Sequence, residues 1–142
     1  MYKKILVPID GSKYSLKALE HASVLASKLD SEISLLYVAE DFNVVQQQIL
    51  PKHVPDHLYN EIKEFAKNML NEARTKLPVN VKVENYLEFG SPRECIVRFA
   101  QENDYDLIII GKRGLGRIKG MIMGSVSSYV VSEAPCPVLV MK

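Results

Sequence analysis

Five short aliphatic runs alternate along this chain with longer stretches of helical spacing, and this alternation limits the fold more than any other feature. The runs are rich in Ile, Leu and Val, which favours buried strands. Between them, apolar residues recur three or four positions apart, as in helices with one buried face. Strands separated by helices cannot pair through hairpins, so the pattern predicts an open, doubly wound parallel sheet with helices on both faces and right-handed crossovers. The expected strands lie at 5–9, 33–38, 79 toward 89, 107–110 and 138–141, and the expected helices at 12–29, 58–77, from 92 onward and 125–134.

Capping and breaking residues mark the helix boundaries. Ser12 is a suitable N-cap for the first helix. Ser91, Pro92 and Glu94 form the pattern of a capping box, with proline at the first helical position. Pro78 and Pro135 follow the second and fourth helices and are expected to end them.

Composition places the chain among ordinary globular proteins. Its 142 residues, 47% hydrophobic and 25% charged, fit one domain covering 1–142. The net charge of +1 gives no global field to attract nucleic acid, and no apolar run is long enough to span a bilayer. The N-terminus lacks a signal-peptide pattern, and Cys95 and Cys136 lack metal-ligand spacing. We therefore expect a reducing, cytoplasmic location and neither a nucleic-acid nor a membrane partner.

The segment from Gly111 to Ser125 is rich in glycine and basic residues and joins the fourth strand to the last helix. Backbone N–H groups and the positive end of the helix dipole converge at such a helix N-terminus, which makes it suited to phosphate. Gly111 and Gly114 are expected to allow close backbone approach or a positive φ. The segment contains four basic side chains, Lys112, Arg113, Arg117 and Lys119. Of these, the two arginines are the better candidates for phosphate ligands.

Two common phosphate motifs do not match this segment. The P-loop requires Lys-[Ser/Thr] after its second glycine, whereas Arg117 and Ile118 follow Gly116 here. The dinucleotide fingerprint requires Gly-x-Gly-x-x-Gly after the first strand, whereas Gly114-x-Gly116 follows the fourth strand and continues to Lys119. The sequence therefore predicts a different kind of phosphate site.

In open parallel sheets, ligands bind beyond the carboxyl ends of the strands, where the strand order reverses. Asp10, Val38 and Gly111 lie at such ends, and Asp10 and Gly111 flank one crevice if the first strand neighbours the fourth. The N–H groups of the last helix's first turn, with the hydroxyls of Ser125 and Ser127, could hold phosphate. Asp10 fits an adenine amino group, a ribose hydroxyl or a phosphate-bound Mg²⁺, or it caps the first helix.

The spacing Gly111-x-x-Gly114, nine residues, then Gly124-Ser125 resembles the glycine signature of the universal stress protein family. The opening Ile5–Ser12 and the ending Ala134–Val140 resemble that family too. The resemblance covers the whole chain and implies a Rossmann-like sheet of order 3-2-1-4-5, usually in a homodimer, with ATP bound as in the branch that carries the full signature. The cofactor-binding residues it implies are Pro8, Ile9, Asp10, Val38, Gly111, Arg113, Gly114, Gly124, Ser125, Val126 and Ser127.

Catalysis is not expected from these residues. No Glu or His falls near the glycine-rich segment, so the base that a hydrolase needs is missing. We expect an ATP-binding regulatory protein, with slow or absent hydrolysis, whose nucleotide orders loops and modulates partner binding. A slow ATPase or a phospho- or nucleotidyl-transferase of the same fold is the alternative. A flavin-binding protein or a receiver domain fits less well, because the first strand is not followed by a hydroxyl-rich phosphate loop or an acidic cluster.

Three further features carry separate expectations. Residues 39–57 lack clear periodicity, and a linker of this length is often functional. His53 and His57 have i, i+4 spacing, but Pro55 between them favours a surface loop over a metal site. The apolar last strand, Val138–Met141, should be a sheet edge, and such an edge predicts a homodimer.

Overall fold

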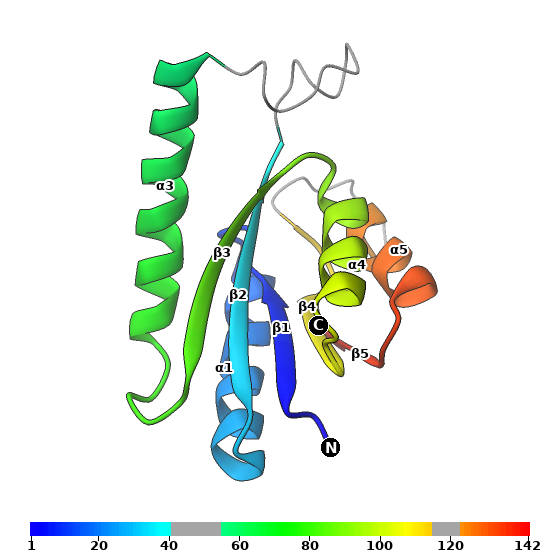
Figure 1. The fold of residues 1–142 in the computed structure, drawn as a ribbon. Helices are drawn as coiled ribbons and strands as arrows, with labels where there is room; N and C mark the ends of the chain where they lie inside the picture. Colours follow the sequence, from blue (N-terminus) through cyan, green and yellow to red (C-terminus); the bar gives the residue numbers. More distant parts are fainter. Residues whose placement is uncertain (41–54, 115–122) are drawn as a thin grey trace.

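The computed structural model describes residues 1–40, 55–114 and 123–142. Five parallel strands form one sheet in the order β3-β2-β1-β4-β5 (Figure 1), so the predicted order 3-2-1-4-5 is confirmed. The strands are β1 (Lys4–Pro8), β2 (Glu32–Ala39), β3 (Val83–Phe89), β4 (Leu107–Gly111) and β5 (Val138–Met141).

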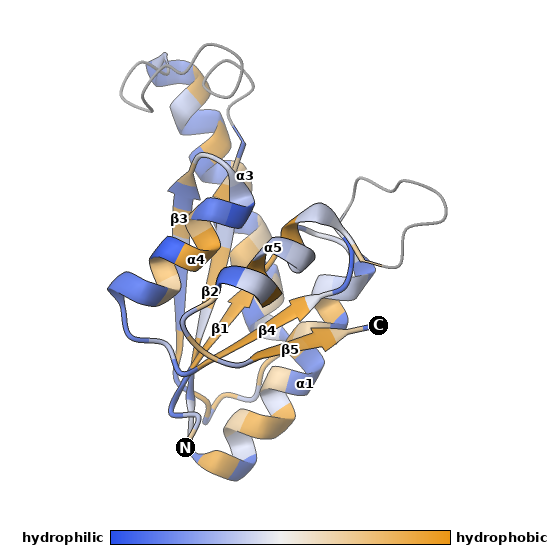
Figure 2. Cartoon of the chain, turned by 90° about the vertical axis from the view of Figure 1, so that its right-hand side faces the viewer, coloured by the Kyte–Doolittle hydropathy of each residue, from blue (hydrophilic) through white to orange (hydrophobic). Residues whose placement is uncertain are grey.

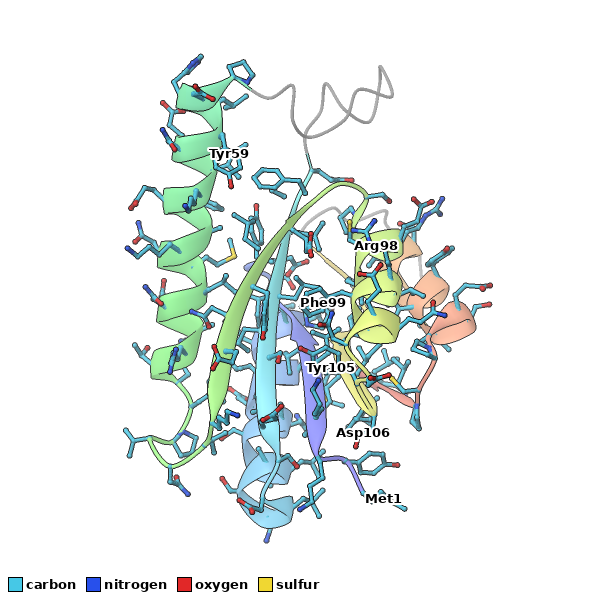
Figure 3. The ribbon with its side chains drawn as sticks, in the orientation of Figure 1. Met1, Tyr59, Arg98, Phe99, Tyr105 and Asp106 are labelled. Carbon is cyan, nitrogen blue, oxygen red and sulfur yellow. The ribbon has the colours of Figure 1, made fainter. Side chains whose placement is uncertain are left out.

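The helices cover both faces of the sheet, as predicted. They are α1 (Lys13–Leu29), α3 (Asp56–Thr75), α4 (Pro92–Glu102) and α5 (Ser125–Glu133). On one face α1 and α3 pack with Ile5 and Val7, and on the other α4 and α5 pack with Leu6. Figure 3 shows Phe99 and Tyr105 in the second layer, where their rings stack with centroids 5.7 Å apart.

The central strand β1 forms the middle of the core. Ile5, Leu6 and Val7 are fully buried because successive side chains point to opposite, helix-covered faces. Figure 2 shows that the strands are mostly apolar, whereas the helices carry both hydrophilic and hydrophobic residues. The continuous hydrophobicity of this strand matches its central position in the sheet.

The register brings the carboxyl ends of the strands to one edge. Pro8 pairs with Leu36 on β2, and Gly111 pairs with Met141 on β5. Ile9 N donates to Leu36 O at 2.8 Å, so hydrogen bonding continues one residue beyond β1. The segments that follow β1, β2 and β4 therefore emerge side by side.

Three local predictions need correction. β3 begins at Val83 rather than near Val79, because Val81 N donates to Pro78 O in a turn that leaves Val79 fully exposed. The capping box does not form: Ser91 occupies the N-cap position of α4 with no side-chain capping bond. His57 lies in α3, not in a loop, since that helix begins directly after Pro55.

Candidate functional site

A cavity of about 460 Å³ opens at the carboxyl edge of the sheet, beyond β1, β2 and β4 and beside the first turns of α1, α4 and α5. Its walls include all eleven cofactor-binding residues that the family resemblance implied, from segments distant in the chain. These residues are Pro8, Ile9, Asp10, Val38, Gly111, Arg113, Gly114, Gly124, Ser125, Val126 and Ser127.

The N-terminus of α5 forms one end of the cavity. Its first intrahelical bond runs from Ser128 N to Gly124 O at 3.0 Å, so the N–H groups of Ser125, Val126 and Ser127 have no acceptor within the helix. No side chain caps the helix at Gly124. These N–H groups and the helix dipole give this end of the cavity a positive potential.

Ser127 has a structural role that the sequence did not reveal. Its side chain is 2% exposed, and its hydroxyl donates toward Lys112 O at 2.6 Å and Gly124 O at 3.1 Å. A hydroxyl has one proton to donate, and here that proton is engaged within the protein, so a bond from Ser127 to a ligand stays a prediction. Gly124 N also donates to Lys112 O, at 2.8 Å, and the two bonds fix α5 against the end of β4.

Arg113 supplies a cation at the same end of the cavity. Its Nε is buried and has no hydrogen-bond partner among the described residues. A buried guanidinium N–H without an acceptor is costly, and an anion in the cavity would satisfy it.

Asp10 has two roles, one for each carboxylate oxygen. Oδ1 accepts from Ser12 N at 2.9 Å and so shapes the turn before α1. Oδ2 lies 2.7 Å from the position that a Cβ on Gly114 would occupy. Asp10 therefore lines the cavity and shapes the turn before α1, but it does not cap that helix, so the capping alternative is wrong. Ser12 itself is the N-cap of α1, as predicted, and accepts from Ser15 N at 3.2 Å.

Gly111 and Gly114 allow close approach of neighbouring groups rather than unusual backbone angles. Among the described glycines only Gly11 and Gly90 have positive φ. A Cβ on Gly111 would lie 2.6 Å from Tyr14 Cβ, so the absent side chain lets α1 pack against β4. The positive φ expected as one option at Gly111 and Gly114 is not found.

Sequence reasoning missed several walls of the cavity. Pro92 and Ile96 enter from α4, and Tyr37 and Glu40 from the end of β2. Burial, followed by the charges of Asp10 and Glu40, raises the pKa of the Tyr37 hydroxyl above its ordinary value. The only available signal was position, since Tyr37 and Glu40 flank Val38 at a strand end.

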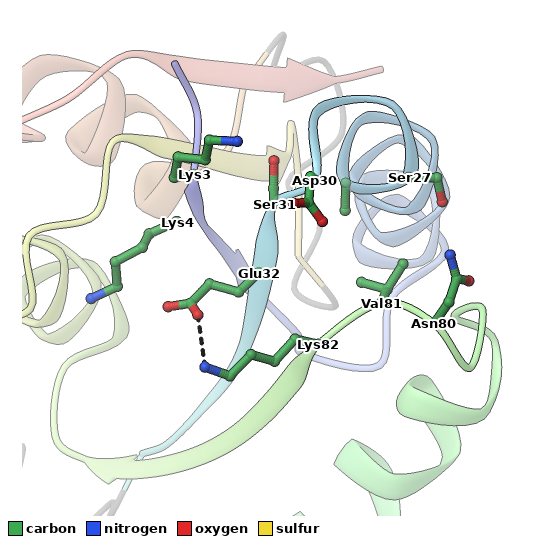
Figure 4. Close-up of a pocket in the computed structure, with 10 residues that line it drawn as sticks. Lys3, Lys4, Ser27, Asp30, Ser31, Glu32, Asn80, Val81 and Lys82 are labelled. Carbon is green, nitrogen blue, oxygen red and sulfur yellow. Dashed lines mark ion pairs between the residues drawn. The ribbon is translucent and has the colours of Figure 1, made fainter.

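A second cavity, of about 410 Å³, lies at the opposite edge of the sheet (Figure 4). Its cationic groups are engaged within the protein: Lys82 pairs with Glu32 at 3.0 Å, and Lys3 Nζ donates to Leu29 O at 3.0 Å. Lys4 Nζ donates to Asn103 O. This cavity is therefore a weaker candidate for binding an anion.

Some sequence predictions lie outside the described residues: Arg117, Lys119, His53 and most of the segment 39–57. Within the described ranges, no group of three or more His, Cys, Asp or Glu side chains is placed to hold a metal ion. The same ranges contain no helix that could cross a bilayer.

Known proteins resemble this chain over its whole length. The model of the universal stress protein family matches residues 1–142. Universal stress protein YxiE of Bacillus subtilis is 35% identical over 148 aligned residues, which cover 100% of both chains. Universal stress protein MJ0577 of Methanocaldococcus jannaschii is 33% identical over 155 aligned residues.

Solved structures agree with these sequence matches. The structure of MJ0577 superposes with a TM-score of 0.87 over 100% of this chain and 96% of that one. The universal stress protein from Archaeoglobus fulgidus in complex with dAMP superposes with a TM-score of 0.67 at 25% identity, over 99% and 98% of the two chains. Fold, signature and matches agree, and the chain belongs to the universal stress protein family.

Proposed function

We propose that this protein binds an adenine nucleotide, ATP in particular, in the cavity at the carboxyl edge of the sheet. The observation that carries the proposal is the buried, unpartnered Nε of Arg113 beside the uncapped N-terminus of α5. Both features favour an anion, and Arg113, Gly124 and Ser125 line one cavity whose volume suits a nucleotide. The dAMP complex of the Archaeoglobus relative supports an adenine nucleotide as the source of that anion.

The cavity walls suggest how the nucleotide lies. Phosphates occupy the end formed by Gly124, Ser125 and Arg113, where donors converge. The base occupies the apolar part, which Val38 and Ile96 line. Asp10 then accepts from the amino group of the base or from a ribose hydroxyl. Any Mg²⁺ is held mainly by the phosphates, since hard cations prefer oxygen ligands.

The same walls favour binding over catalysis. The carboxylates of the cavity are those of Asp10 and Glu40, and both belong to the strand ends rather than to α5. A base for attack on the terminal phosphate is therefore missing from the described walls. We infer that hydrolysis is slow or absent and that bound nucleotide regulates the binding of a further protein in the cytoplasm. The two cysteines, free in the structure, agree with a reducing compartment.

A homodimer through β5 completes the proposal. β5 is an edge of the sheet, and its Leu139 is 38% exposed. An apolar open edge promotes pairing with another strand, and a second copy of β5 offers an identical edge.

Calorimetric titration of ATP against Arg113→Gln tests the nucleotide site. Hydrogen bonds to charged groups contribute about 1.5–3 kcal/mol, so the variant should bind ATP about 10- to 100-fold more weakly than the unmodified protein. Arg74→Gln, in the last turn of α3, is the matched control and should bind normally. Equal affinities for the two variants, or no ATP binding by the unmodified protein, would refute the proposal.

A further inference from the structure

Three lysine side chains gather outside the cavity around the ring of Tyr14, and the main chain of a fourth lysine lies beside one of them. The ring centroid lies 5.3 Å from Lys13 Nζ, 6.0 Å from Lys17 Nζ and 6.0 Å from Lys112 Nζ. Lys17 Nζ also donates to the main-chain oxygen of Lys142 at 3.0 Å, which places the backbone of this fourth lysine at the edge of the group. We call Lys13, Lys17, Lys112 and Lys142 the lysine cluster; none of them lines the cavity.

The fold assembles this cluster from three separate elements. Lys13 and Lys17 are four residues apart and so share one face of α1. Lys112 directly follows β4, and Lys142 directly follows β5, whose end lies beside α1 (Figure 2). Gly111 permits the arrangement, because any side chain there would meet Tyr14 at 2.6 Å and push α1 away.

No Asp or Glu side chain of the described residues forms an ion pair with the lysine cluster. In the described ranges, the ion pair found is Lys82 with Glu32, at the opposite edge of the sheet. Glu20 is the nearest acidic residue along α1, three positions after Lys17, and forms no ion pair with it. The ring face attracts the ammonium groups and holds them together despite their mutual repulsion. The N-terminal end of the α1 dipole adds further positive potential there.

The cluster is open to solvent. Lys13, Lys17 and Lys142 are exposed, and Lys112 is partly exposed. The ammonium groups can therefore reach a ligand that approaches from outside.

We propose that the lysine cluster binds a condensed phosphate chain. Three ammonium groups within about 6 Å of one ring centroid concentrate positive charge and so favour a ligand with a high density of negative charge. An extended acidic peptide brings carboxylates to one side only about every 7 Å, whereas each phosphate unit of a condensed chain carries a charge. Lysine acts as a flexible point charge that suits phosphate oxygens. Single-stranded nucleic acid is disfavoured, because the ring that could stack a base is already occupied by ammonium groups.

The condensed phosphate chain has two sources that share this chemistry. One is free inorganic polyphosphate. The other is the terminal phosphates of a long nucleotide seated in the cavity, because Lys112 belongs to both places: its carbonyl holds Gly124 N and Ser127 Oγ, and its side chain joins the cluster. The proposal itself does not depend on nucleotide binding, since the cluster lies outside the cavity.

Titration of sodium tripolyphosphate against the nucleotide-free protein, at about 0.1 M salt, tests the cluster. Lys13→Glu with Lys17→Glu should weaken binding at least about tenfold, because two attractive charges become repulsive. Lys13→Gln with Lys17→Gln should give a smaller loss. The control is Lys63→Glu with Lys67→Glu, which makes the same charge change at the same spacing on exposed positions of α3 and should change affinity less than about twofold. Thermal melts of all variants verify folding.

Three results would overturn the proposal: no saturable binding by the unmodified protein, equal losses in the two charge-reversed variants, or a loss in Arg113→Gln alone, which would place the anion in the cavity. Tighter binding of an octaglutamate peptide than of tripolyphosphate at the cluster would overturn the choice of phosphate.

Two further results distinguish the sources of the phosphate chain. If adenosine 5′-tetraphosphate binds more tightly than ATP and Lys13→Glu with Lys17→Glu removes the difference, the phosphate chain is part of the nucleotide. If the affinity for tripolyphosphate is unchanged at saturating ATP, the ligand is free inorganic polyphosphate. Either of these last two results supports the proposal.

Discussion

The three described glycines of the signature should respond differently to substitution by alanine, although the signature treats them alike. A Cβ on Gly111 would meet Tyr14 Cβ at 2.6 Å, the Tyr14 carbonyl carbon at 2.8 Å and its oxygen at 3.0 Å. Two of these are backbone atoms of α1, so a whole helix must move. Overpacking of this kind costs about 1–3 kcal/mol, and Gly111→Ala should lie near the upper figure.

The other two positions have softer neighbours. A Cβ on Gly114 would meet Asp10 Oδ2 at 2.7 Å, and this carboxylate can rotate away. This rotation breaks the hydrogen bond from Ser12 N to Oδ1, which lowers the free energy of unfolding by about 1 kcal/mol. A Cβ on Gly124 would meet nothing closer than 3.5 Å, so Gly124→Ala should change the free energy of unfolding by no more than about 0.5 kcal/mol.

Thermal denaturation followed by circular dichroism measures the difference. Unfolding entropy is about 2.1 cal/mol/K per residue, so for 142 residues a loss of about 3 kcal/mol lowers the Tm by about 10 °C. The same relation gives about 3 °C for Gly114→Ala and about 2 °C or less for Gly124→Ala. In ATP titrations the order changes: Gly114→Ala should bind about tenfold more weakly than Gly124→Ala, because it displaces Asp10. Equal Tm losses in all three variants would contradict the packing argument.

Three other substitutions test the remaining roles. Asp10→Asn should lower ATP affinity in calorimetry about tenfold while the Tm moves by less than about 3 °C, and tighter ATP binding would contradict the acceptor role. Ser127→Ala should lower the Tm by about 3–7 °C, because a buried hydroxyl donates to Lys112 O and Gly124 O, whereas the exposed control Ser128→Ala should melt normally. Light scattering at micromolar concentration should give a dimer for the unmodified protein and a monomer for Leu139→Glu, and a monomeric unmodified protein would rule out the β5 interface.

The sequence predicted the elements and their order because these depend on local patterns. Continuous aliphatic runs marked the buried strands, and Ser12 marked the start of α1. The errors fell where a competing local bond decided the outcome. Val79 has strand character, but the turn from Pro78 to Val81 exposes it, and Ser91 has the N-cap position without the side-chain bond.

The glycine spacing and the strand ends allowed the location of the site to be predicted from the sequence, but not its detailed geometry. The residues that came from this reasoning do line one cavity. The direction of each side chain was not predictable, because it depends on tertiary register. Ser127 turns toward Lys112 O rather than outward, and Tyr37 enters the cavity wall beside Val38. The lysine cluster was equally hidden, since its members span positions 13 to 142 and meet only through packing at Gly111.

Lys112 joins features that would otherwise be independent. Its carbonyl accepts from Gly124 N and Ser127 Oγ, so it holds the first turn of α5, where phosphates are proposed to bind. Its N–H donates to Met141 O at 2.7 Å, at the end of the edge strand proposed to dimerise. Its side chain lies over Tyr14 in the lysine cluster. A ligand that moves the first turn of α5 therefore acts on Lys112, which is bonded to the edge strand and belongs to the lysine cluster.

If bound nucleotide changes the affinity of either surface for its partner, that partner must change the affinity for nucleotide by the same factor, because coupling free energies are reciprocal. A binding protein without catalysis can transmit a signal in this way. The signal requires only that the free energy of binding at the surface differs between the nucleotide-bound and the nucleotide-free protein.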